Sequence, residues 1–458
     1  MGSDWPVVTL SDVIEIKYGK DHKKLNEGLI PCYGSGGIMR YVSEYLYDKE
    51  SILIPRKGSL NNIYYLEKPF WTVDTLFWSK INLSKVDPKF LYYQLKLTDF
   101  NRLNEGSAVP SLTVPILNNI KIKLPSIRVQ KSISGILSCL DDKIELIQQT
   151  NETLEKMAQA LFKSWFVDFD PVFDNAFDAG LSVDDFPDEL QHRAMLRQQH
   201  RFEALQQGAE VMMPQTPQST AVLQPQNQQA TQTESERIRG LFPSEFEQCD
   251  DPSIGISGWI PKGWIKDTLD SVAKYSSSRL DGTELNIDNY ISTENMLSNK
   301  MGITQASSIP LNIKTMPAFH QGHVLISNIR PYFQKIWMAT SSGGRSNDVL
   351  GFEVLDKKTE AYLLNLLYQD SFFEYMMTTS TGSKMPRGDK KAIMDWKVVV
   401  SPIKTREVYS EMVKEFYQAI SLRVKENQCL THLRDTLLPK LISGELKFSE
   451  AVQSIETK

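Results

Sequence analysis

Two stretches of the chain carry apolar residues at spacings that alternate between four and three. This spacing averages 3.5 residues and predicts two long helices that pack along a coiled-coil seam. An asparagine holds the same place in both stretches. A buried asparagine there would cost stability but fix the register, unless both asparagines lie at the edge of the seam. The seam positions are Ile133, Leu137, Leu140, Ile144, Ile147, Asn151, Leu154, Ala158, Leu161 and Trp165, and then Tyr409, Val413, Phe416, Ile420, Arg423, Asn427, Leu430, Arg434, Leu437 and Leu441.

The two stretches are copies of one another at a constant offset of 276 residues, so that Asn151 recurs as Asn427. The front ends of the copies also match, because a Trp-x-x-x-x-Leu-x-x-Val pattern begins at Trp5 and again at Trp264, an offset of 259. The difference, 276 − 259, makes the second copy 17 residues longer in its variable part. Two copies are too few for a solenoid, which needs at least three repeats, and they indicate a duplicated domain.

A strand-rich part precedes each helix. Short β-branched runs bounded by Gly, Pro and Asn predict strands at 51–55 and 116–124 in the first copy, and at 324–327 and 393–400 in the second. The sequence therefore predicts an α+β fold with an internal pseudo-two-fold repeat. Two mixed α/β domains would be separated by two long helices that pair as an antiparallel coiled coil.

The expected domains follow from these patterns. The first strand-rich domain, head one, covers residues 1–125, and the second, head two, covers 253–403. The helices cover 126–166 and 404–458, and a helix of about 40 residues is about 60 Å long. Residues 167–252 do not repeat and read as a linker, acidic at first and then rich in Gln and Pro. Four phenylalanines indicate that its start docks onto a folded part: Phe169, Phe173, Phe177 and Phe186.

Composition and charge refine this picture only in part. The net charge is −5, but residues 167–252 hold 16 acidic and five basic residues, so the rest of the chain is at +6. Two mildly basic heads are compatible with nucleic acid without requiring it. The four cysteines are far apart, and the sequence has no apolar run of membrane length and no signal peptide. We therefore expect a cytoplasmic protein with reduced thiols.

The motifs of common enzyme classes are missing from the sequence. It has no Gly-x-x-x-x-Gly-Lys-Ser/Thr, and no Pro-Pro pair that could complete the Asn/Asp-Pro-Pro-aromatic motif of amino-group methyltransferases. The glycine-rich segment 33–37 lacks the spacing of a cofactor loop and reads as a turn or a DNA-facing loop. His320 and His323 have no acidic partner at metal-ligand spacing in the sequence. We expect no catalytic residue and no metal site.

The overall plan, with two variable heads, two similar helices and no active site, resembles the specificity (S) subunit of type I restriction–modification systems. Two helical motifs look like the family's central and distal conserved regions, and two weaker ones in head one look like parts of its recognition domains. The helical motifs are Asn151-x-x-Leu154-Glu155-x-Met157-Ala158-x-x-Leu161-Phe162-x-x-Trp165-Phe166 and Arg434-Asp435-x-Leu437-Leu438-Pro439-Lys440-Leu441-Ile442-Ser443-Gly444-Glu445; the weaker ones are Pro69-Phe70-Trp71-Thr72-Val73-Asp74 and Gly106-Ser107-x-x-Pro110-x-Leu112.

The resemblance implies a non-catalytic protein that works in the prokaryotic cytoplasm. Each head would read one half of an asymmetric bipartite site in double-stranded DNA, and the helices would set the unread gap. The helices would also dock two modification (methyltransferase) subunits, which bring S-adenosylmethionine and methylate adenine N6. Restriction subunits with ATP and Mg would join this core, and the chain itself would bind no cofactor. The residues expected on the docking helices are Asn151, Leu154, Leu161, Trp165, Asn427, Leu430, Leu437 and Leu441.

Polar loop clusters in the two heads are the candidate DNA-binding residues. Arg and Lys can bind guanine edges, Asn and Gln can bind adenine, and Ser or Thr can bind phosphates. Most of these clusters contain a glycine that would allow close approach to a DNA backbone. In head one they hold Arg56, Lys57, Ser59, Asn61, Asn62 and Ser107, and in head two Ser327, Asn328, Arg330, Tyr332, Arg345, Ser346, Asn347, Ser383, Lys384 and Arg387.

Two other classes of function compete with this interpretation. A non-catalytic coiled-coil scaffold with two ligand-binding heads would explain the helices, but not the paired basic loops that follow matching strands. A stand-alone nuclease or methyltransferase conflicts with the missing motifs.

Overall fold

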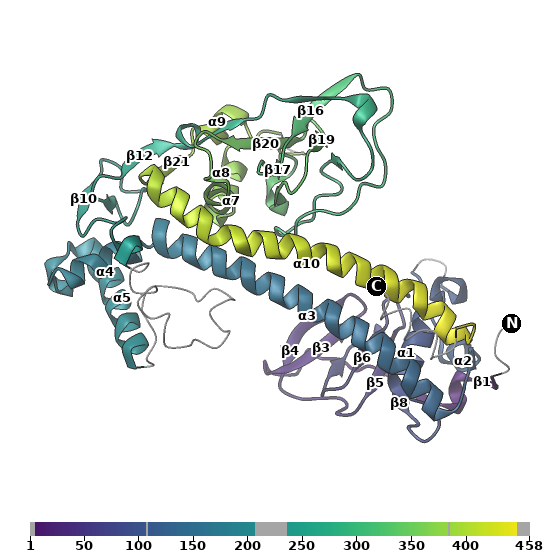
Figure 1. Ribbon diagram of the computed structural model, residues 1–458. Helices are drawn as coiled ribbons and strands as arrows, with labels where there is room; N and C mark the ends of the chain where they lie inside the picture. Colours follow the sequence, from purple (N-terminus) through teal and green to yellow (C-terminus); the bar gives the residue numbers. More distant parts are fainter. Residues whose placement is uncertain (1–4, 107–108, 207–235, 383–384, 447–458) are drawn as a thin grey trace, which may run out of the picture. The chain divides into compact units, whose positions relative to one another are not determined.

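The computed structural model describes residues 5–106, 109–206, 236–382 and 385–446 (Figure 1). The chain divides into two compact units. Unit 1 contains Met1–Gln149 and Arg423–Lys458, and unit 2 contains Thr150–Leu422. Two long helices, α3 (Ile127–Phe166) and α10 (Ile403–Ser443), each contribute one half to each unit. Head one thus lies in unit 1 and head two in unit 2.

Head one is built on an antiparallel sheet with the strand order β2-β8-β5-β6. A second sheet has the order β4-β3-β7, and β1 pairs with β9. The strands are β1 (Val7–Thr9), β2 (Ile14–Tyr18), β3 (Ile30–Gly34), β4 (Gly37–Val42), β5 (Ser51–Pro55), β6 (Tyr64–Leu66), β7 (Trp71–Thr72), β8 (Leu76–Ile81) and β9 (Lys121–Lys123), and the helices are α1 (Pro88–Lys96) and α2 (Val114–Asn118).

Head two repeats this plan. Its main sheet has the order β13-β20-β17-β18, which is the order of the first sheet of head one, and β12-β21 matches β1-β9. A further sheet has the order β14-β16-β19-β15, and β10, from the end of the predicted linker, pairs with β11. The strands are β10 (Phe246–Gln248), β11 (Trp259–Pro261), β12 (Ile265–Thr268), β13 (Ala273–Tyr275), β14 (Arg279–Asp281), β15 (Tyr290–Ile291), β16 (Thr315–Phe319), β17 (Val324–Ser327), β18 (Ile336–Met338), β19 (Gly343–Arg345), β20 (Val349–Val354) and β21 (Lys397–Val400), and the helices are α7 (Glu360–Leu367), α8 (Asp370–Thr378) and α9 (Lys390–Met394).

The predicted duplication is thus confirmed in the strand order, and the strands at 51–55 and 324–327 are confirmed as β5 and β17. The strands predicted at 116–124 and 393–400 are wrong in their first halves, because β9 and β21 begin only at Lys121 and Lys397 and the short helices α2 and α9 extend to Asn118 and Met394. The side chain of Asp389 caps α9 by accepting from the Ala392 amide at 2.8 Å, and a proline stands in the first turn of α2. These local signals favour a helical turn before β9 and β21 begin.

The seam predicted from the heptads is confirmed within each unit. In unit 1, Leu137 and Leu140 of α3 share a core with Leu437 and Leu441 of α10. Asn427 lies in this seam, and its Nδ2 donates to the Ile144 carbonyl at 3.4 Å. The start of α3 therefore pairs with the end of α10, so the two helices run antiparallel, as expected.

In unit 2 the other halves of the same helices pair in the same way. Ala158 and Leu161 of α3 pack with Tyr409 and Val413 of α10, and the Tyr409 hydroxyl donates to the Ala158 carbonyl at 2.9 Å. In both units the seam merges with the core of the head, so each head is fixed to its own half of the helix pair.

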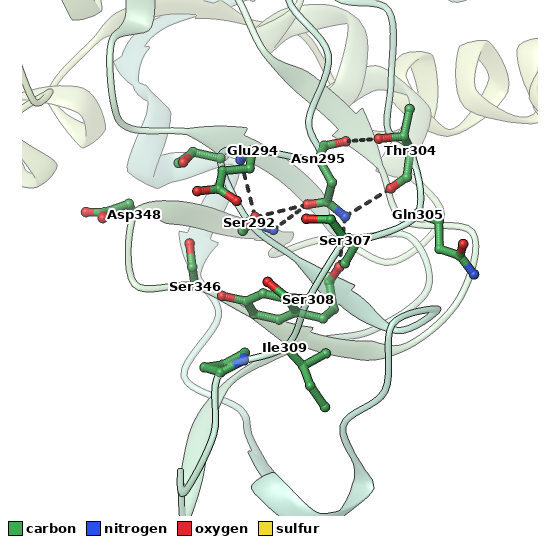
Figure 2. Close-up of a pocket in the computed structure, with 14 residues that line it drawn as sticks. Ser292, Glu294, Asn295, Thr304, Gln305, Ser307, Ser308, Ile309, Ser346 and Asp348 are labelled. Carbon is green, nitrogen blue, oxygen red and sulfur yellow. Dashed lines mark hydrogen bonds between the residues drawn. The ribbon is translucent and has the colours of Figure 1, made fainter.

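Head two differs from head one in the connection that leads to its central strand. In head one, β3 ends at Gly34 and β5 begins at Ser51, whereas in head two β15 ends at Ile291 and β17 begins only at Val324. Most of the additional residues of the second copy therefore fall in this connection. It forms most of the wall of a polar pocket of about 430 Å³ (Figure 2).

The first part of the predicted linker is folded. Residues after α3 form α4 (Asp170–Asp178) and α5 (Asp188–Gln206). The expected docking of the phenylalanines is confirmed, because Phe169 is buried and its ring contacts Trp264, which lies beyond the predicted linker. Most of the Gln- and Pro-rich run lies in residues 207–235, outside the described residues.

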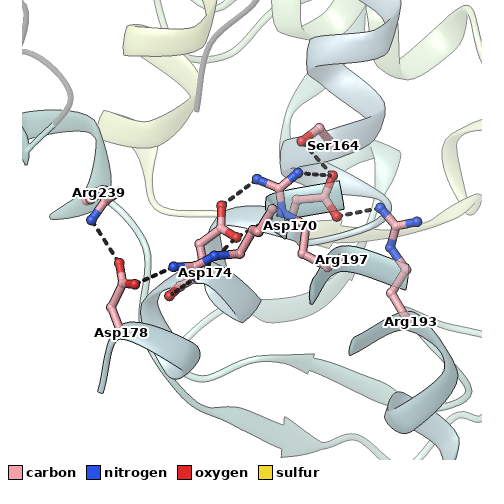
Figure 3. Close-up of polar contacts among 8 residues, drawn as sticks. Ser164, Asp170, Asp174, Asp178, Arg193, Arg197 and Arg239 are labelled. Carbon is pink, nitrogen blue, oxygen red and sulfur yellow. Dashed lines mark hydrogen bonds and ion pairs between the residues drawn. The ribbon is translucent and has the colours of Figure 1, made fainter. Parts of the chain in front are cut away.

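Opposite charges hold α4 and α5 together (Figure 3). Arginines at four-residue steps on α5 face aspartates at four-residue steps on α4, which the acidic composition of this segment had not suggested. The Arg197 Nε donates to Asp174 at 2.8 Å, and Ser164 at the end of α3 donates to Asp170 at 2.8 Å. We call this set the α4–α5 ladder; its members are Asp170, Asp174, Asp178, Arg193, Arg197 and Arg201.

Candidate nucleic-acid interface

In head one, the loop after β5 is held against the loop that precedes α2. Lys57 and Ser111 form an isolated β-bridge, the Gly58 amide donates to the Pro110 carbonyl at 3.1 Å, and the Leu112 amide donates to the Arg56 carbonyl at 2.9 Å. The two segments that carry the polar candidates of head one are therefore neighbours in space.

The glycine-rich segment 33–37 joins the same cluster as the turn of the β3–β4 hairpin, one of the two roles expected for it. The Ser35 carbonyl accepts from Asn62 Nδ2 and from the Tyr64 hydroxyl, both at 3.3 Å. Gly37 has a φ of +114°, a backbone conformation that residues with a side chain rarely adopt. We call residues 35–36, 56–62 and 109–111 the head-one loop cluster.

Most of the predicted residues of head one reach solvent in this cluster. Lys57, Ser59, Asn61 and Asn62 are exposed. The Asn61 side chain also supports the fold, because its Oδ1 accepts a hydrogen bond from the Phe100 amide at 3.0 Å. The half-buried guanidinium of Arg56 donates to the Asp74 carbonyl at 3.2 Å and lies 5.4 Å from the centre of the Tyr18 ring. Ser107 lies outside the described residues.

Head two places its loops in the same way. After β17, Ile329 forms an isolated β-bridge with Arg387, at the position that corresponds to the bridge between Lys57 and Ser111. The Asn328 amide donates to the Asp348 carbonyl at 2.8 Å, and the Arg387 guanidinium pairs with the Asp348 carboxylate at 3.1 Å. We call residues 328–334, 346–348 and 385–388 the head-two loop cluster.

The predicted residues of head two divide into an exposed and a buried group. Exposed side chains are those of Arg330, Tyr332, Asn347 and Arg387, and Ser346 is half-buried. Ser327 and Asn328 are buried: the Ser327 hydroxyl donates to the Ile329 carbonyl at 2.9 Å, and Asn328 Nδ2 donates to the Gly388 carbonyl at 3.2 Å. These two side chains shape the loop from inside. Ser383 and Lys384 lie outside the described residues.

Arg345 is buried, contrary to the expectation of a loop residue that meets DNA. Its guanidinium donates to three backbone carbonyls, those of Ser276 at 3.2 Å, Ala318 at 3.3 Å and Val349 at 2.5 Å. Burial lowers the pKa of Arg345. Gly351 makes room for it, since a Cβ there would lie 2.7 Å from Arg345 Nε. In this structure Arg345 ties strands together and offers no surface to a ligand.

The apolar residues expected on the docking helices lie mainly inside the helix pair. Leu154, Leu161, Trp165, Leu437 and Leu441 are buried, and Asn151, Asn427 and Leu430 are partly buried. Their side chains therefore hold α3 and α10 to each other and to the heads.

Sequence reasoning missed two apolar residues that the helices expose. Leu146 of α3 is 58% exposed and Leu422 of α10 is 69% exposed. They lie outside the seam and are related by the same offset of 276 residues. That repeat of an apolar residue on the outer face was the signal available in the sequence.

The structure also bears on metal and membrane chemistry. Glu353 lies 3.4 Å from His323 Nε2, an acidic neighbour that the sequence spacing did not reveal. No group of three or more His, Cys, Asp or Glu that could hold a metal occurs among the described residues. None of the helices described here is long and apolar enough to cross a membrane.

Known proteins are similar to this chain in sequence and in fold. The family described as "Type I restriction modification DNA specificity domain" matches residues 2–156. The HindI specificity subunit of Haemophilus influenzae is 26% identical over 385 residues, which cover 80% of this chain and 79% of that protein. The EcoDI specificity subunit of Escherichia coli is 22% identical over 466 residues, 97% of this chain and 89% of that protein.

The fold is that of the crystal structure of a type I restriction–modification S subunit from M. genitalium. The TM-score is 0.56 at 15% identity, and the match covers 96% of each chain. The duplicated heads, the paired helices and the sequence relatives all indicate the same family. Residues 2–156 thus match the DNA specificity domain of type I restriction–modification systems, and over most of its length the chain is similar to their specificity (S) subunits.

Proposed function

We propose that each head reads one half of an asymmetric, bipartite DNA site through its loop cluster. The observation that carries this proposal is the equivalence of the two clusters. Each follows the central strand of its sheet, β5 or β17, and each is closed by an isolated β-bridge, between Lys57 and Ser111 or between Ile329 and Arg387. The two clusters occupy one place in a repeated fold and carry different side chains, as two readers of different sequences require.

The exposed side chains of the clusters have the chemistry of base and phosphate recognition. Arginine and lysine bind the guanine edge, asparagine binds adenine, and serine contacts phosphate. The proposed contact residues are Arg56, Lys57, Ser59, Asn61 and Asn62 in head one and Arg330, Tyr332, Ser346, Asn347 and Arg387 in head two, with Ser107, Ser383 and Lys384 on the adjoining segments outside the described residues. Ser327, Asn328 and Arg345 support these loops from within.

We further propose that α3 and α10 set the gap between the half-sites and dock two modification subunits. The exposed Leu146 and Leu422 supply equivalent apolar contacts, one for each of two identical partners. Those partners would bring S-adenosylmethionine, and restriction subunits would bring ATP and Mg, in the cytoplasm of a prokaryote. Because the heads are only mildly basic, we expect the chain alone to bind DNA weakly and the complex to bind it tightly.

Co-expression with the modification subunits tests the reading of DNA. We expect sequencing of methylated adenines in the host DNA to give a single motif, with two defined parts around a fixed gap. Arg330→Ala should change only one part and Lys57→Ala only the other. Lys404→Ala is the control, because Lys404 is an exposed residue of α10 outside both clusters and should leave the motif unchanged.

Two results would contradict the proposal. One is a stable complex that methylates no defined motif. The other is a single loop variant that alters both parts of the motif, because the heads would then not read separately. For docking, Leu146→Glu together with Leu422→Glu should prevent the modification subunits from co-purifying with the chain, while its own unfolding stays the same.

A further inference from the structure

Head two contains a polar pocket beside its loop cluster. It is lined by residues between Tyr290 and Pro310, and by Ser346 and Asp348 from the loop before β20 (Figure 2). The first of these segments lies in the long connection between β15 and β17, where head one has a much shorter one. The pocket walls therefore come mainly from the part of head two that has no counterpart in head one.

The lining of this pocket is polar and acidic and contains no cationic side chain. It contains the carboxylates of Glu294 and Asp348, and none of its 14 residues is Lys, Arg or His. The Ser346 Oγ is buried and has no hydrogen-bond partner in the part of the chain that the structure describes. Such a lining repels a phosphate and suits a group that donates hydrogen bonds.

The walls are held in place before any ligand arrives. Asn295 Nδ2 donates to the carbonyls of Tyr290 at 2.9 Å and Thr304 at 3.0 Å, and its Oδ1 accepts from the Ser292 amide at 2.7 Å. The Ser346 amide donates to the Ile291 carbonyl at 2.8 Å, which ties the second wall to the first. By contrast, the exposed carboxylate of Glu294 makes no hydrogen bond or ion pair with the described residues, so it is available.

The pocket shares a wall with the head-two loop cluster. Asp348 lines the pocket, pairs with Arg387 at 3.1 Å and accepts from the Asn328 amide through its carbonyl. A ligand bound to the loop cluster therefore lies beside the pocket. Each base pair of DNA offers one exocyclic amino group in the major groove, on adenine N6 or cytosine N4, and Glu and Asp accept from such groups.

We propose that this pocket accepts the exocyclic amino group of one base in the half-site read by head two, with Glu294 and Ser346 as the acceptors. The inference rests on the proposed function of head two. It gives head two a means of discrimination that head one lacks, and it adds Glu294, which lies outside the loops that the sequence singled out, to the base contacts.

The experiment uses the complete complex of the chain with its modification subunits. The motif is first determined with the wild-type chain, and Arg330→Ala identifies which half belongs to head two. Duplexes are then made in which one base of that half, other than the methylated adenine, lacks only its amino group: purine replaces adenine, or 2-pyrimidinone replaces cytosine. Methylation rates with these duplexes are compared for wild type, Glu294→Ala, Ser346→Ala and the control Glu374→Ala, an exposed carboxylate on α8.

We expect one position at which loss of the amino group slows wild type and the control about tenfold, the order of a single base contact. Glu294→Ala should be almost insensitive to the same loss, and Ser346→Ala should be less sensitive than wild type. The substituted base at that position tells whether the group is adenine N6 or cytosine N4.

Three results would overturn the inference. If Glu294→Ala keeps full discrimination at every position of that half-site, the pocket reads no base. If the Glu294→Ala chain instead no longer binds the modification subunits, while the motif that is methylated stays the same, the pocket binds a protein partner. If the wild-type chain directs methylation to no bipartite motif, the proposed function itself fails and takes this inference with it.

Discussion

Two arginines of head two have opposite environments, although both lie in polar surroundings in the sequence. Arg330 is exposed in the loop after β17. Arg345 is buried at the end of β19, where its guanidinium satisfies carbonyls from three different segments of the chain. Arg330 can therefore bind a ligand, whereas the Arg345 guanidinium is occupied by its hydrogen bonds to backbone carbonyls.

Substitution of these two arginines should separate stability from DNA recognition. Arg345→Met leaves three buried carbonyls without donors and should lower the free energy of unfolding by roughly 3 kcal/mol. Arg330→Ala, the matched control, should change it by less than about 0.5 kcal/mol, as expected at an exposed site. Urea unfolding followed by circular dichroism measures both values. Equal effects of the two substitutions would refute the assignment.

His323 should make the stability of head two depend on pH. Burial lowers the pKa of His323 below its ordinary value of 6.5, against the opposing effect of Glu353. The unfolded chain therefore binds a proton more readily than the folded chain. Stability should fall as the pH drops below about 6.5 and should be unaffected by this group above it.

Thermal unfolding between about pH 8 and about pH 5 tests the sign of this dependence. His323→Gln should reduce the loss of stability at the acidic end, and His432→Gln, at an exposed position of α10, should not. If the wild-type chain instead became more stable through the protonation of His323, the attraction of Glu353 would outweigh burial.

At the scale of elements, the α4–α5 ladder shows how a strongly acidic segment becomes a folded part of unit 2. Its aspartates are neutralised by arginines of the next helix, and Asp174 is only 2% exposed. The four-residue steps on both helices place all the charges on facing sides. The four-residue spacing of the aspartates and arginines is present in the sequence, but the net charge of the segment does not show that these residues pair.

Removal of one ladder arginine should loosen α4 and α5. Arg197→Ala leaves the buried carboxylates of Asp170 and Asp174 with fewer partners and should destabilise the hairpin by about 3 kcal/mol. Hydrogen exchange of the α4 backbone amides should become faster, whereas Gln198→Ala at the neighbouring exposed position should not change it. Unchanged exchange in Arg197→Ala would show that apolar packing alone holds the hairpin.

At the scale of the whole molecule, the seam between α3 and α10 is continuous in period while the chain folds as two units. Each half of the helix pair is fixed to its own head by a shared core. This arrangement suits a spacer, because its length can change without changing either head.

Insertion of one heptad into both helices tests the role of the spacer. Seven residues after Gln148 and seven at the equivalent position after Val424 preserve the 3.5-residue period and lengthen each helix by about 10 Å. That length corresponds to about three base pairs of B-DNA, so we expect the gap in the methylated motif to grow by about three base pairs with both half-sites unchanged. An insertion into only one helix should abolish methylation, because the two seams would no longer match. An unchanged gap would contradict the role of the helices as a spacer.

By itself, the sequence determined the features that depend on the order of residues along the chain. The heptad seam, the offset of 276 residues and the strands β5 and β17 were all predicted, because period and repetition are local properties. The last residues of α2 and α9 were mistaken for strand residues, because the isoleucines there, Ile116 and Ile393, outweighed the helix-start signals of the proline and Asp389.

Only the tertiary structure decided which polar residues of the heads reach solvent. In the sequence, Arg345 and Asn328 stand among polar residues, as the exposed residues beside them do. Their hydrogen-bond partners, however, lie on strands and loops that are distant in the sequence. The same holds for the pocket, whose acceptors at Glu294 and Ser346 come from segments about 50 residues apart. Burial and hydrogen bonding depend on which parts of the chain meet, and that is settled by the packing of the sheets rather than by any local pattern.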